Sequence, residues 1–532
     1  MDTLYRAFAG IIERKLTEEI ETKNLLSETQ FGFRTGRGAM ECVYIVNWLM
    51  NRKRRERDKG LCMCFMDMKS AFDKVEREKL WRMMEKREVS ENLRRMIEAL
   101  YEKVEMEIWV DGRGEGAFKT KRGLRQGCPL SGILFNIYMS DLEQWLAGRQ
   151  VGEIKIGNMI IRSLSFADDI IMLADSKENM RRMMKEMEKY MERKGMEINV
   201  EKTMVMVGKG SKWEGKVEIG WRGEKISEVR EVKYLGYWIT KNGGTERHIK
   251  ERLSKAKKIM GVVWSEGERV FKENMKMRLM MYDNLVASVM LYGVEIFGWK
   301  EYKPIESIQE RYIRWLLGLN RSVPEYIARS ELNREKMRIK MGVLANKFEE
   351  KIRESNSAIM REVYKELEKA REPCTEWMKQ RDNYYKRNGM YVEEVIRLRS
   401  LGIKMGGVLK ERDQEVEMQE RVEKIMMSKY NELYKEIYVR WIPGYIEHAD
   451  NLKNMRMIAR FRSGCEMRAS EYWRKEEEKK CRICQNEEET FWHVRNGCRV
   501  EEEGVEKRGV WYLLGEKGGG KKWMESVHRR RK

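Results

Sequence analysis

Residues 165–173 read SFADDIIML, and the interpretation of the whole chain starts from them. An alternating run at residues 163–166 precedes two adjacent acids, and a continuously apolar run at residues 170–173 follows. An alternating run, a polar break and an apolar run predict a β-hairpin with carboxylates at its tip. Because Asp side chains bond nearby backbone, Asp168 and Asp169 by themselves are also ordinary turn residues. A third acid, in a similar setting, favours a functional role.

That third acid is Asp67. Residues 61–66 read LCMCFM, which predicts a short buried strand that ends at this carboxylate. Acids at the ends of two strands that meet in one sheet can hold two divalent cations about 4 Å apart, which serves in-line displacement at a phosphoryl group. Carboxylate oxygens suit Mg²⁺. The pattern therefore predicts that Asp67, Asp168 and Asp169 hold two Mg²⁺ ions.

The charge balance favours a polyanionic partner. The 532 residues include 108 Lys and Arg against 87 Asp and Glu, a formal net charge of +21. Such an excess suits nucleic acid through phosphate neutralisation, although a generally basic protein is the plain alternative. Nine cysteines are too few for a disulfide framework, and no secretory signal opens the chain. No apolar run approaches the roughly 18 residues that span a bilayer. We therefore expect a reduced nuclear or cytoplasmic setting without a membrane partner.

Two glycine-rich basic loops are candidate phosphate or nucleotide sites. Residues 27–38 contain three glycines with Arg34 and Arg37, which suits backbone approach to phosphate, although an ordinary glycine turn explains the loop equally simply. In the second loop, Gln126 and Gly127 precede a helix predicted at residues 133–146. Backbone amides at that helix N-terminus suit a nucleotide or template backbone.

The remaining periodicity predicts a mixed α+β chain that becomes helical after about residue 245. Before that point we expect helices at residues 4–20, 39–57 and 92–103, a methionine-rich helix ended by Gly195, a strand at residues 196–203 that enters a turn with Lys202, and a hairpin at residues 229–239. Charged helices continue to about residue 438 without a chemical motif.

Taken together, the motifs resemble a known family. In chain order they read QFGFR at residues 30–34, FMD with AFD at residues 65–73, RQGCPLS at residues 125–131, FADD at residues 166–169, GMEIN with KT at residues 195–203, and YLG at residues 234–236. They resemble the ordered motifs of reverse transcriptases, and the FADD and RQGCPLS forms are similar to those of non-LTR (LINE-type) retrotransposons.

The resemblance implies a right-hand polymerase with an antiparallel palm sheet. Fingers and palm would span residues 1–240, a helical thumb residues 241–345 and a helical connector residues 346–475. The implied activity is RNA-directed DNA polymerisation, in which dNTPs are added to a primer 3′-hydroxyl on an RNA template, with DNA as primer or target.

The resemblance also implies roles for single residues. Asp67 and Asp168 would be the principal metal ligands, with Asp169 supporting them. Phe72 would be the aromatic gate beneath the sugar 2′ position. The other implied roles are the nucleotide and template pocket for Gln126 and Gly127, protonation of the leaving pyrophosphate for Lys202, and phosphate contacts for Arg34 and Arg37.

Two departures from the family pattern leave an alternative open. Such enzymes usually carry further fingers sequence, whereas this chain begins in what resembles the following helix, so we expect an N-terminal truncation. Gly132 stands where the family commonly has Pro. No endonuclease constellation is visible. The alternative function is a catalytically silent, retrotransposon-derived protein that binds nucleic acid, and an intron- or telomere-type enzyme fits less well.

A second metal site is expected near the C-terminus. Cys481, Cys484, His493 and Cys498 have the spacing C-x2-C-x8-H-x4-C, and three thiolates with one imidazole make a closed tetrahedral set for structural Zn²⁺. The other six cysteines show no such spacing. The segment at residues 476–503 resembles the zinc knuckle that follows the thumb in this retrotransposon family, where it would bind RNA or target DNA. Residues 504–532 are expected to form a flexible basic tail.

Overall fold

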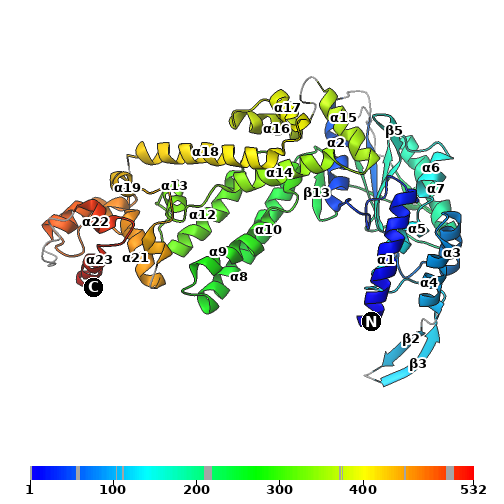
Figure 1. Ribbon diagram of the computed structural model, residues 1–532, viewed down its shortest axis with the longest axis horizontal. Helices are drawn as coiled ribbons and strands as arrows, with labels where there is room; N and C mark the ends of the chain where they lie inside the picture. Colours follow the sequence, from blue (N-terminus) through cyan, green and yellow to red (C-terminus); the bar gives the residue numbers. More distant parts are fainter. Residues whose placement is uncertain are drawn as a thin grey trace. The chain divides into compact units, whose positions relative to one another are not determined.

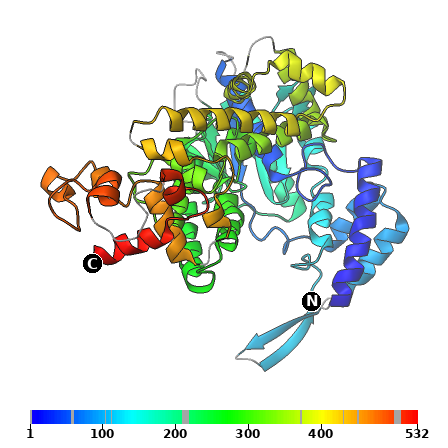
Figure 2. The same ribbon diagram turned by 60° about the vertical axis from the view of Figure 1, so that its left-hand side comes forward.

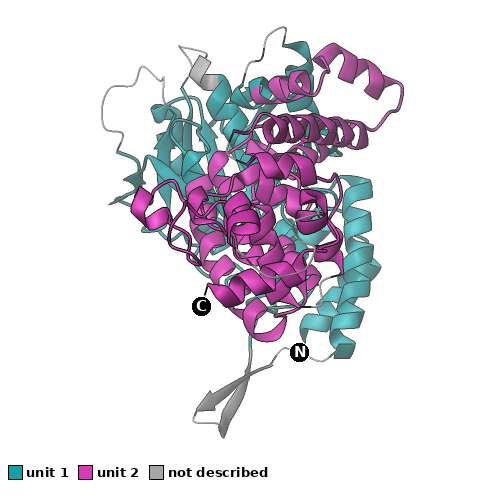
Figure 3. Cartoon of the chain, turned by 90° about the vertical axis from the view of Figure 1, so that its left-hand side faces the viewer, with its two compact units in different colours: residues 1–248, 348–379 teal, residues 249–347, 380–532 magenta. Residues whose placement is uncertain are grey.

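The computed structural model describes residues 3–55, 60–102, 105–110, 113–208, 218–370, 373, 375–429, 431–448, 451–498 and 509–531. The chain divides into two compact units (Figure 3). Unit 1 comprises residues 1–248 and 348–379, and unit 2 comprises residues 249–347 and 380–532. The strands β1 to β13 all fall in unit 1, and helices make up most of the rest. The predicted α+β class is therefore confirmed.

Unit 1 is built on a five-stranded sheet in the order β11-β8-β1-β7-β6. The strands are β1 (Cys62–Met66), β6 (Ser163–Phe166), β7 (Asp169–Ala174), β8 (Met204–Val207) and β11 (Ser227–Glu228). Neighbours from β8 to β6 pair antiparallel, whereas β11 pairs parallel with β8. The sheet is mixed, which corrects the expected antiparallel sheet. Residues 208–226 give the chain enough length to return in the same direction along β8.

Strand β1 lies in the middle of this sheet, and all five of its residues are buried. Cys62, Cys64 and Met66 enter the main core of unit 1. Phe65 points to the opposite face, where its ring lies 5.7 Å from that of Tyr234. A continuous apolar run is what a strand needs when both of its faces are covered.

The main core is closed by helices that lie around the sheet. These are α1 (Thr3–Lys23), α3 (Arg77–Lys86), α4 (Glu91–Glu102), α5 (Leu130–Tyr138), α6 (Leu142–Ala147) and α7 (Lys177–Lys194). Helix α1 packs against α4 and α5 (Figure 2). Helix α2 (Ala39–Arg55) contacts β6 and β13, and α15 (Ala358–Lys369) contacts α2.

Short two-stranded ribbons complete unit 1. They are β2 (Glu105–Val110) with β3 (Arg113–Lys119), β4 (Ile154–Ile156) with β5 (Met159–Ile161), β9 (Gly220–Trp221) with β10 (Glu224–Lys225), and β12 (Glu231–Tyr234) with β13 (Tyr237–Thr240). The last is the predicted hairpin. Its two-residue turn, Leu235-Gly236, has positive φ at both positions, +46° and +76°. That turn geometry matches the twist of the flanking strands.

Helix α7 forms as its sequence predicts. Ser176 caps its start by accepting a hydrogen bond from the Asn179 backbone N–H, and Gly195 ends it in the left-handed conformation at φ 66°. Five methionines at helical spacing are buried along one face: Met180, Met183, Met184, Met187 and Met191. The methionine-rich stripe is therefore core.

Two elements differ from the sequence expectations. The helix predicted at residues 133–146 is split into α5 and α6, and Asp141 between them forms a buried ion pair with Lys194 at 2.9 Å and accepts a hydrogen bond from the Tyr190 hydroxyl at 2.7 Å. The strand predicted at residues 196–203 is a turn with a single bridge, Met68 to Ile198, and the strand itself begins at Met204. In both places tertiary hydrogen bonds override the local pattern.

Unit 2 is helical (Figure 1). Its elements are α8 (Glu246–Val270), α9 (Met275–Met281), a π-helical turn (Tyr282–Val286), α10 (Ala287–Met290), α11 (Val294–Phe297), α12 (Lys303–Leu317), α13 (Glu325–Glu331), α17 (Val392–Ser400), α18 (Met405–Met426), α19 (Glu432–Ile437), α20 (Gly444–Glu447), α21 (Leu452–Arg462), η2 (Arg468–Ser470), η3 (Glu476–Lys479), η4 (His493–Gly497), α22 (Val510–Leu514) and α23 (Lys521–Arg530). Three helices cross a boundary between the units: α8, whose first three residues belong to unit 1, α14 (Met337–Arg353) and α16 (Glu376–Arg387).

The C-terminal segment is ordered, which corrects the expected flexible tail. Residues 504–508 lie outside the described residues, but α22 and α23 follow them, and Trp523, Met524 and Val527 are buried. Apolar side chains spaced by one, three and four residues give α23 a face that packs into the unit 2 core. Within the predicted connector at residues 346–475, residues 348–379 belong to unit 1 and residues 380–475 to unit 2. Among the described helices, none has the length and apolarity that a bilayer crossing requires.

Candidate functional site

The register of β1 against β7 brings the predicted acids together. Met66 pairs with Ile170 in this antiparallel ladder, so the next step places Asp67 opposite Asp169. Cβ atoms of directly opposed residues lie about 4.5–5.5 Å apart. Asp168 lies beside them in the β6–β7 turn, where Phe166 pairs with Asp169 and only Ala167 and Asp168 are left to make the connection.

The turn that carries Asp168 is held by a neighbouring loop. Ala167 has a φ of +57°, which is uncommon for a residue with a side chain. The Phe31 backbone N–H donates to the Ser165 carbonyl at 2.8 Å, and the loop continues to Gly32. A Cβ atom at Gly32 would lie 2.6 Å from the Ala167 nitrogen, so only glycine fits there. The QFGFR motif thus positions the acidic turn.

The electrostatics of the acids follow from burial and mutual repulsion. Burial raises the pKa of Asp169 to about 6, and the nearby charges of Asp168 and Asp67 act in the same direction. Burial likewise raises the pKa of Asp168, with a further contribution from Asp67. Like charges gathered in a partly desolvated place favour a cation that would compensate them.

The three carboxylates are close but do not form a tight cluster. In the described part of the chain, the one group of three or more potential metal ligands whose ligand atoms all lie within 4.8 Å is the C-terminal Cys/His set. Lys202 lies on the side of Asp67, with its Nζ atom 3.9 Å from Asp67 Oδ2. The structure therefore groups Lys202 with the predicted acids, which share one end of the sheet.

The turn that carries Lys202 is fixed to the end of β1 by hydrogen bonds that the sequence did not reveal. The Asn199 backbone N–H donates to the Asp67 carbonyl at 2.7 Å, and the Lys69 N–H donates to the Glu197 carbonyl at 2.8 Å. The Thr203 hydroxyl in turn donates to the Asn199 carbonyl at 2.8 Å. The GMEIN and KT residues thus have a structural role that their spacing alone did not show.

The loop that contains Gln126 and Gly127 lies next to the helix that follows Phe72. The Gln126 amide is exposed and donates to Asp73 Oδ1 at 3.5 Å, while Gly127 adopts a φ of +78°. The Phe72 ring stacks on that of Phe135, with ring centres 4.9 Å apart. The structure therefore brings these three predicted residues into one neighbourhood.

This loop is organised by a residue that the sequence analysis missed. The buried Arg77 guanidinium donates to the carbonyl oxygens of Thr120, Arg122 and Gly123 at 2.6, 3.1 and 2.9 Å. An arginine at the first position of a helix gives no recognisable sequence signal for such a role. Without it, three buried or partly buried carbonyl groups would lose their partners.

Arg34 and Arg37 are structural, which corrects the expected phosphate contacts. Arg34 donates to both carboxylate oxygens of Glu21, at 3.0 and 2.7 Å. Arg37 donates to both oxygens of Glu28, at 2.9 and 3.1 Å. Their side chains are 1% and 3% exposed, so the guanidinium donors are consumed inside the fold. Glycine-rich basic loops look alike in sequence whether their arginines face in or out.

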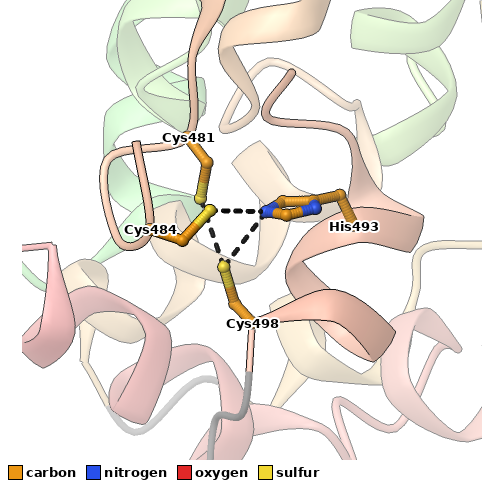
Figure 4. Close-up of side chains that lie close together, drawn as sticks. All are labelled: Cys481, Cys484, His493 and Cys498. Carbon is orange, nitrogen blue, oxygen red and sulfur yellow. Dashed lines mark hydrogen bonds between the residues drawn. The ribbon is translucent and has the colours of Figure 1, made fainter. Parts of the chain in front are cut away.

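The C-terminal cysteines and histidine converge as their spacing predicts (Figure 4). The Cys484 Sγ and Cys498 Sγ atoms lie 3.2 and 3.1 Å from His493 Nε2, and Cys481 Sγ lies 3.4 Å from Cys498 Sγ. All four ligand atoms lie within 4.8 Å of one another. Three sulfur atoms and one imidazole nitrogen are a donor set that suits tetrahedral Zn²⁺.

Surrounding groups act on two of these side chains, Cys484 and His493. Backbone N–H groups of Asn486 and Glu487 lower the pKa of the Cys484 thiol to about 6, which favours the thiolate that a metal needs. The other ring nitrogen of His493 lies 2.7 Å from the Glu487 carboxylate. A carboxylate in that place fixes the ring and makes the ligand nitrogen more basic. Sequence spacing did not single out Glu487.

The cluster is also tied to the C-terminal helix. The Glu489 carboxylate is fully buried and accepts hydrogen bonds from Arg482 and Arg531, the latter at 2.7 Å. Arg531 also pairs with Glu466 at 3.0 Å. These ion pairs join the metal-binding loop, the segment before it and α23 into one body.

We expect the purified protein to contain one zinc ion per chain. Structural zinc sites typically contribute about 10 kcal/mol or more of apparent binding energy, so a strong chelator should release the loop around Cys484 to protease. Elemental analysis and limited proteolysis measure both effects. Cys484→Ser should lose the metal, whereas Cys465→Ala, which removes a thiol outside the cluster, should keep it. Zinc retained by Cys484→Ser would contradict the assignment.

We also expect Asp169→Asn to stabilise the metal-free protein at neutral pH. Because the folded-state pKa of Asp169, about 6, lies above the ordinary value of 3.8, its ionised form costs the folded state free energy, and stability falls as the pH rises between those values. Asparagine removes this cost, which is on the order of 1 kcal/mol after solvent screening.

Thermal melts in chelator at pH 7.5 and pH 4 test this expectation. The variant should melt higher at pH 7.5 and lose that advantage at pH 4. Asp73→Asn, at an exposed position, serves as the control and should change neither melt. A variant that is no more stable than the parent at pH 7.5 would show that the ionised Asp169 carboxylate does not destabilise the folded protein.

Comparisons with known proteins show what this chain is similar to. Residues 1–239 match the model of the family described as reverse transcriptase (RNA-dependent DNA polymerase). The Pol polyprotein of the R2 retrotransposable element of Nasonia vitripennis is 29% identical over 210 residues, which cover 38% of this chain and 20% of that protein. The RNA-directed DNA polymerase of the mobile element jockey of Drosophila funebris is 25% identical over 299 residues, which cover 54% and 31%.

A solved telomerase from Candida tropicalis, in complex with a fragment of telomeric RNA, covers 69% of this chain and 57% of that one at 14% identity and a TM-score of 0.35. The chain spans about a fifth to a third of the length of the two curated relatives named above. Residues 1–239 therefore match the reverse transcriptase family, and the chain is similar to the polymerase proteins of non-LTR retrotransposons of the R2 and jockey kind.

Proposed function

We propose that this chain is an RNA-directed DNA polymerase, which adds dNTPs to the 3′-hydroxyl of a primer paired with an RNA template. The observation that carries the proposal is the β1–β7 register, which puts Asp67 opposite Asp169 and next to the Asp168 turn. The match of residues 1–239 to the reverse transcriptase family supports it independently. DNA as primer or target and an RNA template are the partners that this activity needs.

The proposal includes a right-hand architecture. Residues 1–240 would form fingers and palm, residues 241–345 the thumb, residues 346–475 a connector, and residues 476–503 a knuckle that holds Zn²⁺. In the palm, the acids lie at one end of the sheet, and both faces of β1 are buried. A rigid, buried strand suits a site in which carboxylates must be placed to within a fraction of an ångström.

Two Mg²⁺ ions fit the three acids by donor chemistry, since carboxylate oxygens are hard ligands and the site is a concentration of negative charge. When bound, such ions lower the pKa of the attacking hydroxyl and stabilise the charge on the leaving group. Asp67 and Asp168 would supply the principal ligands, and Asp169 would support them. The exposed Lys202 amine, 3.9 Å from Asp67, would donate a proton to the departing pyrophosphate.

The remaining side chains would position the incoming nucleotide. Stacking on Phe135 fixes the position of the Phe72 ring, so the ring could contact the sugar of the nucleotide. Gln126 is exposed next to Asp73, and Gly127 allows close backbone approach. In this arrangement the Phe72 ring would exclude a 2′-hydroxyl by its bulk.

We expect Asp168→Asn to abolish primer extension on poly(rA)/oligo(dT) with Mg²⁺ while the nucleic acid stays bound. Loss of several kcal/mol of charge stabilisation in the transition state corresponds to roughly a thousandfold in rate. Binding depends on phosphate contacts elsewhere, so it should change little. Asp175→Asn, an exposed acid at the other end of β7, is the matched control and should extend normally.

Two results would separate the candidate functions. Extension by Asp168→Asn at the parent rate would refute the site assignment. A parent protein that binds the primer–template but never extends it would instead support the catalytically silent, nucleic-acid-binding alternative.

We expect Phe72→Ala to admit ribonucleotides. Removal of the ring should lower the ratio of kcat/KM for dTTP over UTP by about tenfold or more, the scale of discrimination that a pocket gains from a small group. Phe72→Tyr keeps the ring and should keep the ratio. Loss of the Phe135 contact also lowers the stability of the variant by about 1 kcal/mol. This loss affects kcat/KM for dTTP and for UTP equally, so it does not change their ratio. An unchanged ratio in Phe72→Ala would place the gate elsewhere.

A further inference from the structure

Unit 2 contains an open groove that is separate from the acids and from the metal cluster. Its volume is about 1110 Å³, and its lining comes from residues 253–321 and 471–474. Helices α8 and α12 supply most of the lining, and the loop between α12 and α13 and the segment after η2 supply the rest. Sites for single small ligands measure roughly 300–1,000 Å³ and enclose their ligand. This groove is larger and open, which suits a section of a polymer.

The charge of the groove is strongly one-sided. Six cations line it, against the single carboxylate of Glu471: Lys257, Lys303, Arg311, Arg314, Arg321 and Arg474. Two of them are engaged, because Arg314 donates to the Val323 carbonyl and Arg474 pairs with Glu471. In the described part of the chain the other four have no carboxylate partner within 4 Å and are exposed. Those four charges remain available to a polyanion.

Two exposed tryptophans accompany these cations. Trp315 on α12 is 38% exposed, and Trp473 after η2 is 53% exposed. On α12, Arg311 and Trp315 lie one helical turn apart, with the guanidinium 5.8 Å from the indole centre. Large apolar rings are normally kept from water, so indoles that share a groove with cations point to a flat, negatively charged ligand.

From these observations we propose that the groove binds single-stranded nucleic acid, with phosphates at the exposed cations and unpaired bases stacked on Trp315 and Trp473. A duplex keeps its bases stacked on one another and offers mainly phosphates, whereas a single strand offers both groups that this groove would hold. An acidic peptide matches the charge but leaves the two indoles unexplained. The inference goes beyond polymerisation, since it concerns a separate surface of unit 2.

The test measures binding without nucleotides, so that it does not depend on the proposed catalysis. The full chain carrying Asp168→Asn is titrated into fluorescein-labelled 12-nucleotide oligo(rU), oligo(dT) and a 12-base-pair duplex, and anisotropy is recorded over a range of salt. Trp473→Ala should weaken binding of the single strands about tenfold, the usual effect of losing one stacked base, and leave the duplex nearly unchanged. Trp473→Phe should restore most of the affinity.

Charge variants provide a second readout. Lys257→Gln with Lys303→Gln should lower the slope of log affinity against log salt by about 1.4, or 0.7 for each lost phosphate contact on a single strand. The matched controls are Trp511→Ala, which is 50% exposed on α22, and Lys410→Gln with Lys453→Gln, exposed on α18 and α21. These controls should bind like the parent.

Three outcomes would overturn the proposal. The first is that Trp473→Ala binds single strands as tightly as Trp511→Ala does. The second is that Trp473→Ala loses duplex and single-strand binding to the same extent. The third is that a 12-residue poly-Glu peptide at matched charge displaces oligo(rU). The last result would identify an acidic protein as the occupant. Equal binding of oligo(rU) and oligo(dT) supports a general single-strand site, and preference for oligo(rU) supports RNA as its ligand.

Discussion

The antiparallel pairing of β1 with β7 is the constraint on which the proposed site depends. A strand with both faces buried cannot shift its register by one residue without turning every side chain to the wrong core. Cys62, Cys64 and Met66 on one face and Phe65 on the other hold that register. Asp67 and Asp169 are opposed because of it. Apolar packing, rather than any attraction between the acids, brings these like charges together.

The same packing explains why the acids favour a cation. Burial and mutual repulsion raise the pKa values of Asp168 and Asp169, so their ionised forms destabilise the folded protein. The loop with Gly32 and the turn with Asn199 fix the strand ends from two sides. The positive φ of Ala167 and the repulsion among the carboxylates are features expected at a ligand-binding site.

Net charge gives only a first indication of where a polyanion could bind, because many arginines form ion pairs inside the fold. Arg462 and Glu331 form a fully buried ion pair, and the Tyr434 hydroxyl donates to the same carboxylate at 2.7 Å. Such pairs must be kept whole, since removal of one partner leaves an uncompensated buried charge. Arg34 and Arg37 are also buried, and each pairs with a partly exposed glutamate. The four exposed cations of the unit 2 groove lack carboxylate partners in the described part of the chain, so their charges remain available to a polyanion.

The sequence by itself determined the elements whose cause is local. These include the α7 helix with its Ser176 and Gly195 ends, the hairpins at Asp168 and at Leu235-Gly236, and the Cys/His set, whose spacing limits where its ligands can lie. Ordered motifs indicated the family that residues 1–239 match. Tertiary structure alone decided that the sheet is mixed, that the chain breaks before α6, and that the C-terminal segment folds into packed helices. It also decided that Arg34 and Arg37 point inward and that unit 2 has a groove. Each of these depends on partners distant in sequence, and a local pattern contains no information about which distant side chain it will meet.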